Sequence, residues 1–198
     1  MSAHAQPKIT AEEYLEAERS ATFRSEYYGG YVYALAGGTW AHSMVINNLA
    51  RELGNALKQT PCGVTSNDLR LAVSPTTMYT YPDVMVICGE PHFIDSRQDS
   101  VTNPTLIVEV LSPSTERYDR GFKSAQYRAV ESLQEYALVW QTEPHVEVFR
   151  RHGKDEWLLK ESIGLDATCR FESVDAAIPL SEIYARITFE AAVGPPRD

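Results

Sequence analysis

The chain has 198 residues, of which 43% are hydrophobic and 23% are charged, and this ordinary globular composition predicts one domain over residues 1–198 with a core of about 9–187. A net charge of −9 excludes a nonspecific nucleic-acid coat, because such proteins displace counterions from phosphate with a basic surface. No stretch approaches the roughly 20 apolar residues of a membrane span, and residues 1–8 lack the apolar run of a secretory signal, so we expect a soluble, cytoplasmic protein without a membrane partner.

The N-terminal part is predicted to contain a helix, a hairpin and a second helix. Thr10 and Glu13 have the spacing of a capping box, which satisfies free amides at a helix start. Gly29 and Gly30 suit a tight hairpin turn between two short strands. Apolar residues then recur every four positions from Val45, the interval of one helix face. The predicted elements are a helix over 11–20, two strands within 23–35 and a helix over 40–59.

Strands dominate the rest of the chain, which completes an α/β pattern. The run from Thr105 to Leu111 is apolar on both alternating faces, as expected for a strand covered on both sides at the centre of a sheet. Phe122, Ala125 and Ala129 then recur at helical intervals. We expect strands over 63–73, 83–88, 105–111, 136–141, 145–150 and 156–163, helices over 116–132 and near 180–185, and a frayed tail over 194–198.

The three cysteines, Cys62, Cys88 and Cys169, are odd in number and widely separated. They offer neither a disulfide framework nor the C-x-x-C spacing of a zinc knuckle. We interpret them as buried free thiols, the common state of unpaired cysteine.

Glu109 is the most informative residue, because it stands within the apolar strand on the same face as Ile107 and Leu111. A buried, ionised carboxylate is costly unless something compensates its charge. The candidates are a buried Arg or Lys, protonation, or a metal ion. A purely structural salt bridge is the alternative without a functional role.

Asp83 begins another apolar strand, directly after Pro82. Alone it is weak evidence, since Pro-Asp often marks only a turn. Two carboxylates on neighbouring strand ends would repel each other unless a cation lay between them, and Mg²⁺ typically takes one or two protein carboxylates together with water and substrate phosphate. Asp83 and Glu109 together therefore predict a site for Mg²⁺, with Mn²⁺ as a second candidate.

These residues resemble a known signature. Pro82-Asp83, followed by Glu109 in a buried strand 26 positions after Asp83 (109 − 83), is similar to the PD-(D/E)XK nuclease motif. The wider pattern resembles a large bacterial family of restriction-endonuclease-like proteins of largely unknown function, and the similarity runs from Ile9 to Tyr184. The segments that carry it are residues 25–30, 41–42, 81–84, 109–115 and 119–123, with Tyr127.

The resemblance implies a restriction-endonuclease-like core, in which a mixed central β-sheet is flanked by helices. It also implies that Asp83 and Glu109 are catalytic metal ligands and that Glu26 is a third acidic member of the site. Glu26 lies at the edge of the predicted hairpin, where a solvated glutamate is an equally good interpretation.

The motif lysine is displaced in this chain. It should stand two residues after Glu109, where the sequence has Leu111, which cannot orient or deprotonate water. The resemblance offers Lys123 as a catalytic substitute. The alternative is an ordinary surface pair between Lys123 and Asp119, which are four residues apart on one predicted helix.

Other candidates carry weaker signals. His42 begins the second helix and is either a metal or phosphate ligand or a satisfied polar residue. Asp68 is either a supporting residue or part of a turn, and Tyr127 either faces the site or packs in the core. The basic residues of the third helix are the best candidates for a phosphate-facing patch: Arg117, Arg120, Lys123 and Arg128.

Two functions follow. The first is a Mg²⁺-dependent endonuclease that hydrolyses DNA phosphodiester bonds, bound through a local patch, with a homodimer expected because two strands must be cut. The second is a catalytically inactive binding or assembly module with the same fold, which Leu111 and the acidic net charge favour.

Overall fold

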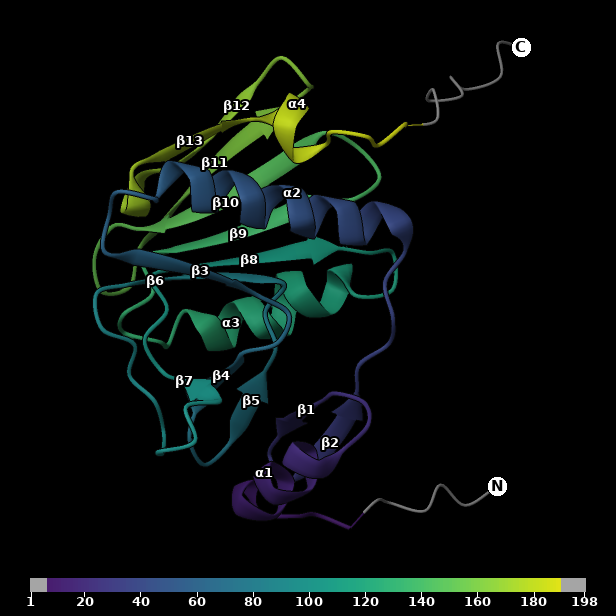
Figure 1. Ribbon diagram of the computed structural model, residues 1–198, viewed down its shortest axis with the longest axis vertical. Coiled ribbons are helices and arrows are strands. Elements are labelled where there is room, and N and C mark those ends of the chain that lie inside the picture. The colour runs from purple at the N-terminus through teal and green to yellow at the C-terminus, as the bar shows by residue number, and fades with distance from the viewer. Residues whose placement is uncertain (1–6, 190–198) are drawn as a thin grey trace.

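The structure is a computed structural model that describes residues 7–189, so the predicted frayed tail over 194–198 lies outside the described residues. A six-stranded mixed sheet forms its centre, in the order β11-β10-β9-β8-β6-β3 (Figure 1). β8 lies between parallel β9 and antiparallel β6, in the predicted central position. The strands are β3 (Cys62–Ser66), β6 (Val84–Cys88), β8 (Leu106–Leu111), β9 (Glu135–Trp140), β10 (His145–Arg151) and β11 (Trp157–Ile163).

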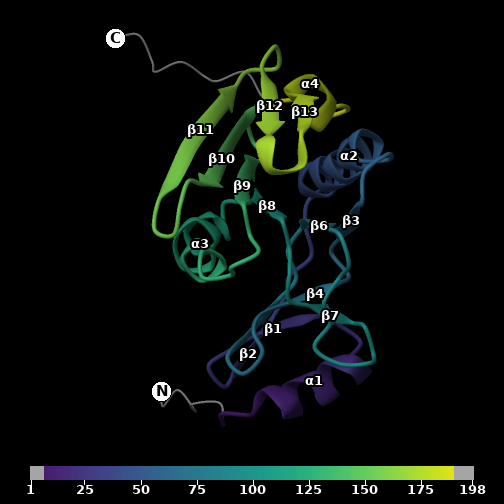
Figure 2. The same cartoon turned by 90° about the vertical axis from the view of Figure 1, so that its left-hand side faces the viewer.

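A second, five-stranded sheet lies beside the first, in the order β2-β1-β5-β4-β7, and α1 (Ala11–Ser20) packs against it (Figure 2). The capping box of Thr10 and Glu13 forms as predicted. The strands are β1 (Ser25–Tyr28), β2 (Tyr31–Ala34), β4 (Arg70–Ser74), β5 (Met78–Thr80) and β7 (Ser100–Val101).

The single strand predicted over 63–73 is wrong. The chain turns at Asn67, which has a φ of 58°, and this turn places β3 in the central sheet and β4 in the second sheet. A left-handed residue interrupts a strand, and asparagine adopts that conformation more readily than most residues. Two elements of the second sheet, β5 and β7, were not anticipated because they are only three and two residues long.

Helices cover both faces of the central sheet (Figures 1 and 2). α2 (Trp40–Ala56) packs on one face, where Val108 and Val110 of β8 join its leucines in one apolar cluster. Tyr127 packs on the opposite face with Ile107 and Leu111. Because side chains alternate along a strand, Glu109 points to this second face. Within the described chain, no helix has the length and apolarity that crossing a bilayer requires.

The third helix differs from the prediction over 116–132. It consists of a π-helical segment, η1 (Tyr118–Lys123), followed by one turn of α-helix, α3 (Ser124–Tyr127). The amide of Ser124 donates to the carbonyl of Asp119, five residues earlier, which widens this turn. After β9, β10 and β11, the last elements of the described chain are β12 (Thr168–Phe171), η2 (Glu172–Val174), β13 (Ala176–Pro179) and α4 (Leu180–Ile183).

The cysteine prediction is wrong for two of the three residues. Cys62 on β3 lies directly opposite Cys88 on β6, and the two form a disulfide. Their separation of 26 residues conceals this pairing in the sequence, because it appears only when the strand register is known. Cys169 is the buried free thiol that was expected.

Candidate active site

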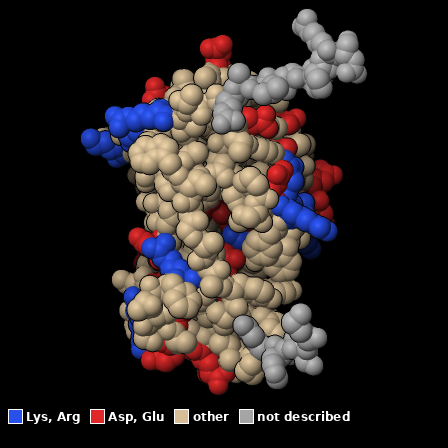
Figure 3. Space-filling view, turned by 90° about the vertical axis from the view of Figure 1, so that its right-hand side faces the viewer, with Lys and Arg blue, Asp and Glu red and all other residues tan. Residues whose placement is uncertain are grey.

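A cavity of about 680 Å³ opens where the two sheets meet the N-terminus of α2 and the segment η1. Figure 3 shows the hollow on this face, with acidic and basic side chains at its bottom and uncharged residues around it. Five of the predicted residues line it: His42, Asp83, Glu109, Asp119 and Lys123.

Asp83 and Glu109 lie side by side at the bottom of the cavity. Val84, the first residue of β6, pairs with Val108 of β8. Because the two strands are antiparallel, Asp83, which precedes Val84, lies opposite Glu109, which follows Val108. The amide of Asp83 donates to Oε2 of Glu109 at 3.4 Å, and the amide of Val110 donates to Oδ2 of Asp83 at 2.8 Å. These bonds fix both carboxylates next to each other, where Asp83 leads into β6 beside β8.

Glu109 is buried and engaged on its other oxygen. Its Oε1 accepts hydrogen bonds from the ammonium of Lys123 at 3.1 Å and from the hydroxyl of Tyr127 at 2.8 Å. Burial raises the pKa of Glu109 to about 8, and the nearby Asp119 and Asp83 add to this shift while Lys123 opposes it. The raised pKa shows that burial, together with the neighbouring carboxylates, outweighs the effect of the ammonium.

Lys123 is itself buried, with 6% of its surface exposed, and carboxylates surround it. Its Nζ lies 3.0 Å from Oε1 of Glu26 and 3.5 Å from Oδ1 of Asp119, in addition to the contact with Glu109. Burial lowers the pKa of this amine, but the carboxylates together raise it well above its ordinary value, so the ammonium stays charged. The surface interpretations of Glu26 and of the Lys123–Asp119 pair are therefore wrong.

The ammonium of Lys123 reaches the strand from the helical segment formed by η1 and α3. Asp119, Lys123 and Tyr127 follow one another at four-residue steps and face β8 together. Leu111, which stands at the position of the motif lysine, packs instead in the apolar cluster below the sheet. The ammonium beside Glu109 therefore comes from the helical segment and not from the strand.

His42 approaches the carboxylate of Asp83 from the first turn of α2. Its amide donates to the hydroxyl of Thr39, the N-cap residue, which fixes the helix start. Its Nε2 lies 3.5 Å from Oδ2 of Asp83. Burial lowers the pKa of the ring, but hydrogen bonds to Asp83 and to the backbone of Val110 outweigh this effect and raise it.

The carboxylate of Glu26 contacts the ammonium of Lys123 rather than the carboxylates of Asp83 and Glu109. Its Oε2 accepts a hydrogen bond from Tyr118 at 3.2 Å, a residue the sequence did not single out, and its Oε1 is buried beside Lys123 without an aligned hydrogen bond. No cavity group in residues 7–189 brings ligand atoms of three acidic or histidine side chains within 4.8 Å of one another.

Two weaker predictions find no place in the cavity. Asp68 is exposed and forms an ion pair with Arg24 at the surface. The predicted basic patch on the third helix loses Lys123, which is buried, and Arg120, whose guanidinium donates to Glu147 at 2.9 Å.

The residues present fit a hard divalent cation. Four carboxylates gather around the cavity, opposed by the ammonium of Lys123 and the ring of His42. Within residues 7–189, Oδ1 of Asp83 accepts no hydrogen bond, although its side chain is only 16% exposed. Two neighbouring carboxylates with access to water are the ligand set that Mg²⁺ commonly uses.

The chain as a whole is similar to one protein family and to two proteins of known sequence. The family model Uma2, described as "Putative restriction endonuclease", matches residues 11–177. Two uncharacterized proteins of Synechocystis sp. are similar over most of their length. The protein sll1609 is 40% identical over 163 residues, 82% of this chain and 92% of that protein, and slr1290 is 36% identical over 185 residues, 92% of this chain and 95% of that protein.

A solved structure shares the fold. It is described as a "putative nuclease belonging to DUF820" from Anabaena variabilis and superposes with a TM-score of 0.71, over 89% of this chain and 97% of that one. Its sequence identity is 17%, so the comparison concerns the fold alone. The mixed sheet flanked by helices is thus a restriction-endonuclease-like nuclease fold.

Proposed function

The chain belongs to the Uma2 family, and from this premise we propose that it is a divalent-metal-dependent endonuclease that hydrolyses phosphodiester bonds in DNA. One observation carries the proposal: two strand carboxylates and a buried ammonium meet at the bottom of one open cavity. A structural salt bridge would need only one acid and one base.

Asp83 and Glu109 are the residues that would hold Mg²⁺ or Mn²⁺. A bound ion of this kind polarises a phosphate and lowers the pKa of a bound water. The peptide amides of Asp83 and Val110 keep both carboxylates in place before the substrate arrives. Such preorganisation supports catalysis because the protein need not rearrange during the reaction.

Lys123 is assigned the charge-stabilising role. Its ammonium lines the cavity and keeps its positive charge among three carboxylates. We assign to it a hydrogen bond to the phosphate oxygen on which negative charge develops as water adds to phosphorus and the ester P–O bond breaks. Glu26 and Asp119 are positioning residues, since both contact the ammonium and would keep its direction fixed.

Tyr127 and His42 are assigned supporting roles. The hydroxyl of Tyr127 is hydrogen-bonded to the hydroxyl of Thr80 and donates to Oε1 of Glu109. These two bonds would keep that oxygen of Glu109 in place. His42 faces Asp83 from the other side and lines the cavity, so it is placed to contact the ion or a phosphate oxygen.

A nucleic-acid substrate suits the mouth of the cavity. Phe23 lies on its rim with 64% of its surface exposed, and Arg24 stands beside it. Exposed aromatic rings stack on bases, and arginine binds phosphate, so this rim offers a local patch in an otherwise acidic protein. A DNA substrate also implies a cytoplasmic location and, for duplex cleavage, a homodimer.

The test is nicking of supercoiled plasmid DNA with Mg²⁺ or Mn²⁺ by the wild type, by Asp83→Asn and by Asp155→Asn. The two substitutions are chemically identical, but Asp83 lines the cavity, whereas Asp155 is exposed in the turn between β10 and β11. We expect nicking by the wild type and by Asp155→Asn, and none by Asp83→Asn. The nuclease proposal fails if the wild type is inactive with both metals, or if Asp83→Asn nicks as well as the wild type. The alternative, an inactive binding module, which Leu111 favours, then replaces it.

A further inference from the structure

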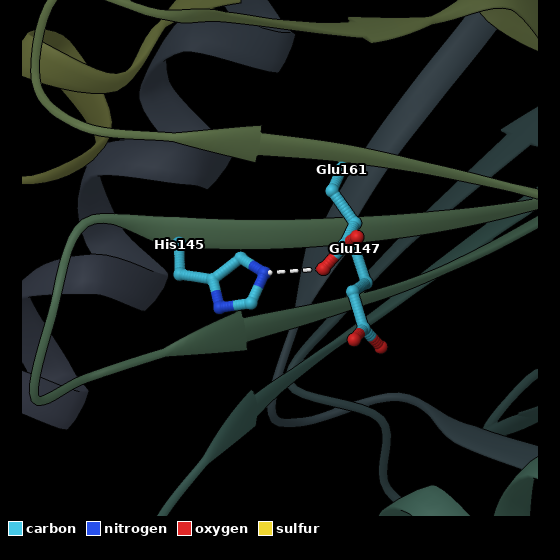
Figure 4. A group of neighbouring side chains, drawn as sticks. All are labelled: His145, Glu147 and Glu161. Carbon is cyan, nitrogen blue, oxygen red and sulfur yellow. Dashed lines mark hydrogen bonds and ion pairs between the residues drawn. The ribbon is translucent and has the colours of Figure 1, made fainter.

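A second cluster of metal-ligating side chains lies on the central sheet, apart from the cavity. His145 and Glu147 stand on β10, and Glu161 stands on β11. One ligand atom from each comes within 4.8 Å of the other two, and Figure 4 shows the three side chains on neighbouring strands. The Nε2 of His145 lies 3.0 Å from Oε1 of Glu161.

The strand register creates this cluster. His145 and Glu147 are two residues apart, so they project from the same face of β10. Glu147 pairs directly with Glu161 across the antiparallel ladder. Like charges directly opposite each other destabilise a sheet. The arrangement therefore sets two glutamates directly opposite each other, with the guanidinium of Arg120 against Glu147 and the ring of His145 against Glu161.

Glu147 adds an independent observation. The residue is 6% exposed, and its Oε2 is buried without a hydrogen-bond partner among the described residues. Its other oxygen, Oε1, accepts a hydrogen bond from Arg120 at 2.9 Å, which orients the carboxylate. An unsatisfied buried carboxylate oxygen is costly, and a coordinated metal ion is one of the few groups that satisfy it.

The histidine is held in place by its surroundings. Its ring stacks on Trp140 with the centroids 4.1 Å apart and an interplanar angle of 6°. Its amide donates to the hydroxyl of Tyr184 at 3.1 Å. Ligands whose orientation is fixed by neighbouring groups bind metal more tightly than mobile ones.

We propose that His145, Glu147 and Glu161 form a site for a divalent transition-metal ion of the zinc type. One imidazole nitrogen and two carboxylate oxygens suit Zn²⁺, whereas Mg²⁺ prefers oxygen ligands alone. Glu161 is 48% exposed at its side chain, so the site opens to solvent and a water fills the fourth position. The ion links β10 to β11, the outermost strand of the sheet, and stabilises that edge.

The site does not depend on the proposed nuclease activity, because it shares no ligand with the cavity. The experiment uses the full chain with Asp83→Asn and Glu109→Gln, so that the cavity carboxylates cannot contribute. After treatment with a chelator, this protein is titrated with Zn²⁺ by calorimetry and its bound zinc is counted after dialysis. We expect one equivalent of zinc and a raised melting temperature.

Variants at the surface of the site keep the test decisive. In the same background we expect Glu161→Gln and His145→Gln each to weaken zinc binding at least tenfold. The control is His152→Gln, at an exposed histidine in the turn between β10 and β11, and it should leave zinc binding unchanged. Glu147→Gln should abolish binding, although its burial can also affect folding. Absence of zinc binding in the parent protein, or equal affinity in Glu161→Gln and His145→Gln, overturns the proposal.

Discussion

Lys123 meets Glu109 inside the protein, with Nζ 3.1 Å from Oε1, although one residue comes from a π-helical turn and the other from the central strand of the sheet. The strand position that the nuclease motif reserves for lysine is occupied by Leu111, which packs in the core. The charge has thus moved to another element while its distance to the glutamate remains that of a hydrogen bond.

Replacement of Lys123 by glutamine should reduce DNA cleavage by about 100-fold or more, the loss that follows removal of one donor to a developing negative charge. It should also lower stability, because Glu26, Glu109 and Asp119 lose their shared cation, and breaking a buried ion pair costs about 3–5 kcal/mol. Plasmid cleavage and urea unfolding measure the two effects. Lys58→Gln, at an exposed lysine, is the matched control and should change neither. Cleavage at the wild-type rate by folded Lys123→Gln would remove the lysine from the mechanism.

Gly38→Ala tests His42 without changing the histidine itself. A Cβ on Gly38 would lie 2.8 Å from Nδ1 of His42, so the ring must move away from its place beside Asp83. We expect cleavage to fall about tenfold, equivalent to about 1.4 kcal/mol in the activation barrier. The melting temperature should change little. At the neighbouring Gly37, an added Cβ meets nothing within 4 Å, so Gly37→Ala should remain fully active. Equal activities of the two variants would show that the ring position is unimportant.

Asp99 should contribute to acid denaturation. A hydrogen bond from Arg19, opposed by burial and aided by Arg70, holds the pKa of this carboxyl well below its usual range. In the unfolded chain it returns to about 3.9, so the unfolded state binds a proton that the folded state resists. The stabilising effect is present above that unfolded pKa and is lost as the pH falls toward the folded one. We expect stability to drop below about pH 4 in the wild type, and to drop less steeply in Asp99→Asn. Parallel pH profiles of the two proteins would contradict this assignment.

The disulfide can be tested by counting thiols. Protein purified without reductant and then denatured should react with an alkylating reagent at Cys169 alone, and at all three cysteines after reduction. Closing a loop of this size should stabilise the oxidised form by about 2–4 kcal/mol. Mass spectrometry counts the modified thiols, and urea unfolding with and without reductant measures the stability. Three reactive thiols before reduction would show that the bond is absent.

The sequence predicts much of the fold because its signals are local. The capping box at Thr10, the Gly29-Gly30 turn and the apolar run around Glu109 each specify an element from neighbouring residues. The split at Asn67 and the Cys62–Cys88 bond were missed because both depend on which strands pair. Register also brings Glu147 opposite Glu161, so the second metal-ligating cluster has no signal in the sequence.

The site is less predictable than the fold for a similar reason. Asp83 and Glu109 could be paired from the sequence because each acid interrupts or begins an apolar strand. The burial of Glu26 and the reach of Lys123 depend on the packing of the second sheet and on the π-helical turn. Tyr118 carries no sequence signal at all, since its hydrogen bond to Glu26 joins residues 92 positions apart.

The central claim is that Asp83 and Glu109 together bind a divalent cation, and calorimetric titration of Mg²⁺ into the full chain tests it most directly. Mg²⁺ discriminates against the histidine-containing cluster because it prefers oxygen ligands. We predict that the wild type and Asp68→Asn bind the ion equally, and that Asp83→Asn and Glu109→Gln each weaken binding at least about tenfold, or about 1.4 kcal/mol. Unchanged affinity in both cavity variants, or no binding by the wild type, would contradict the claim.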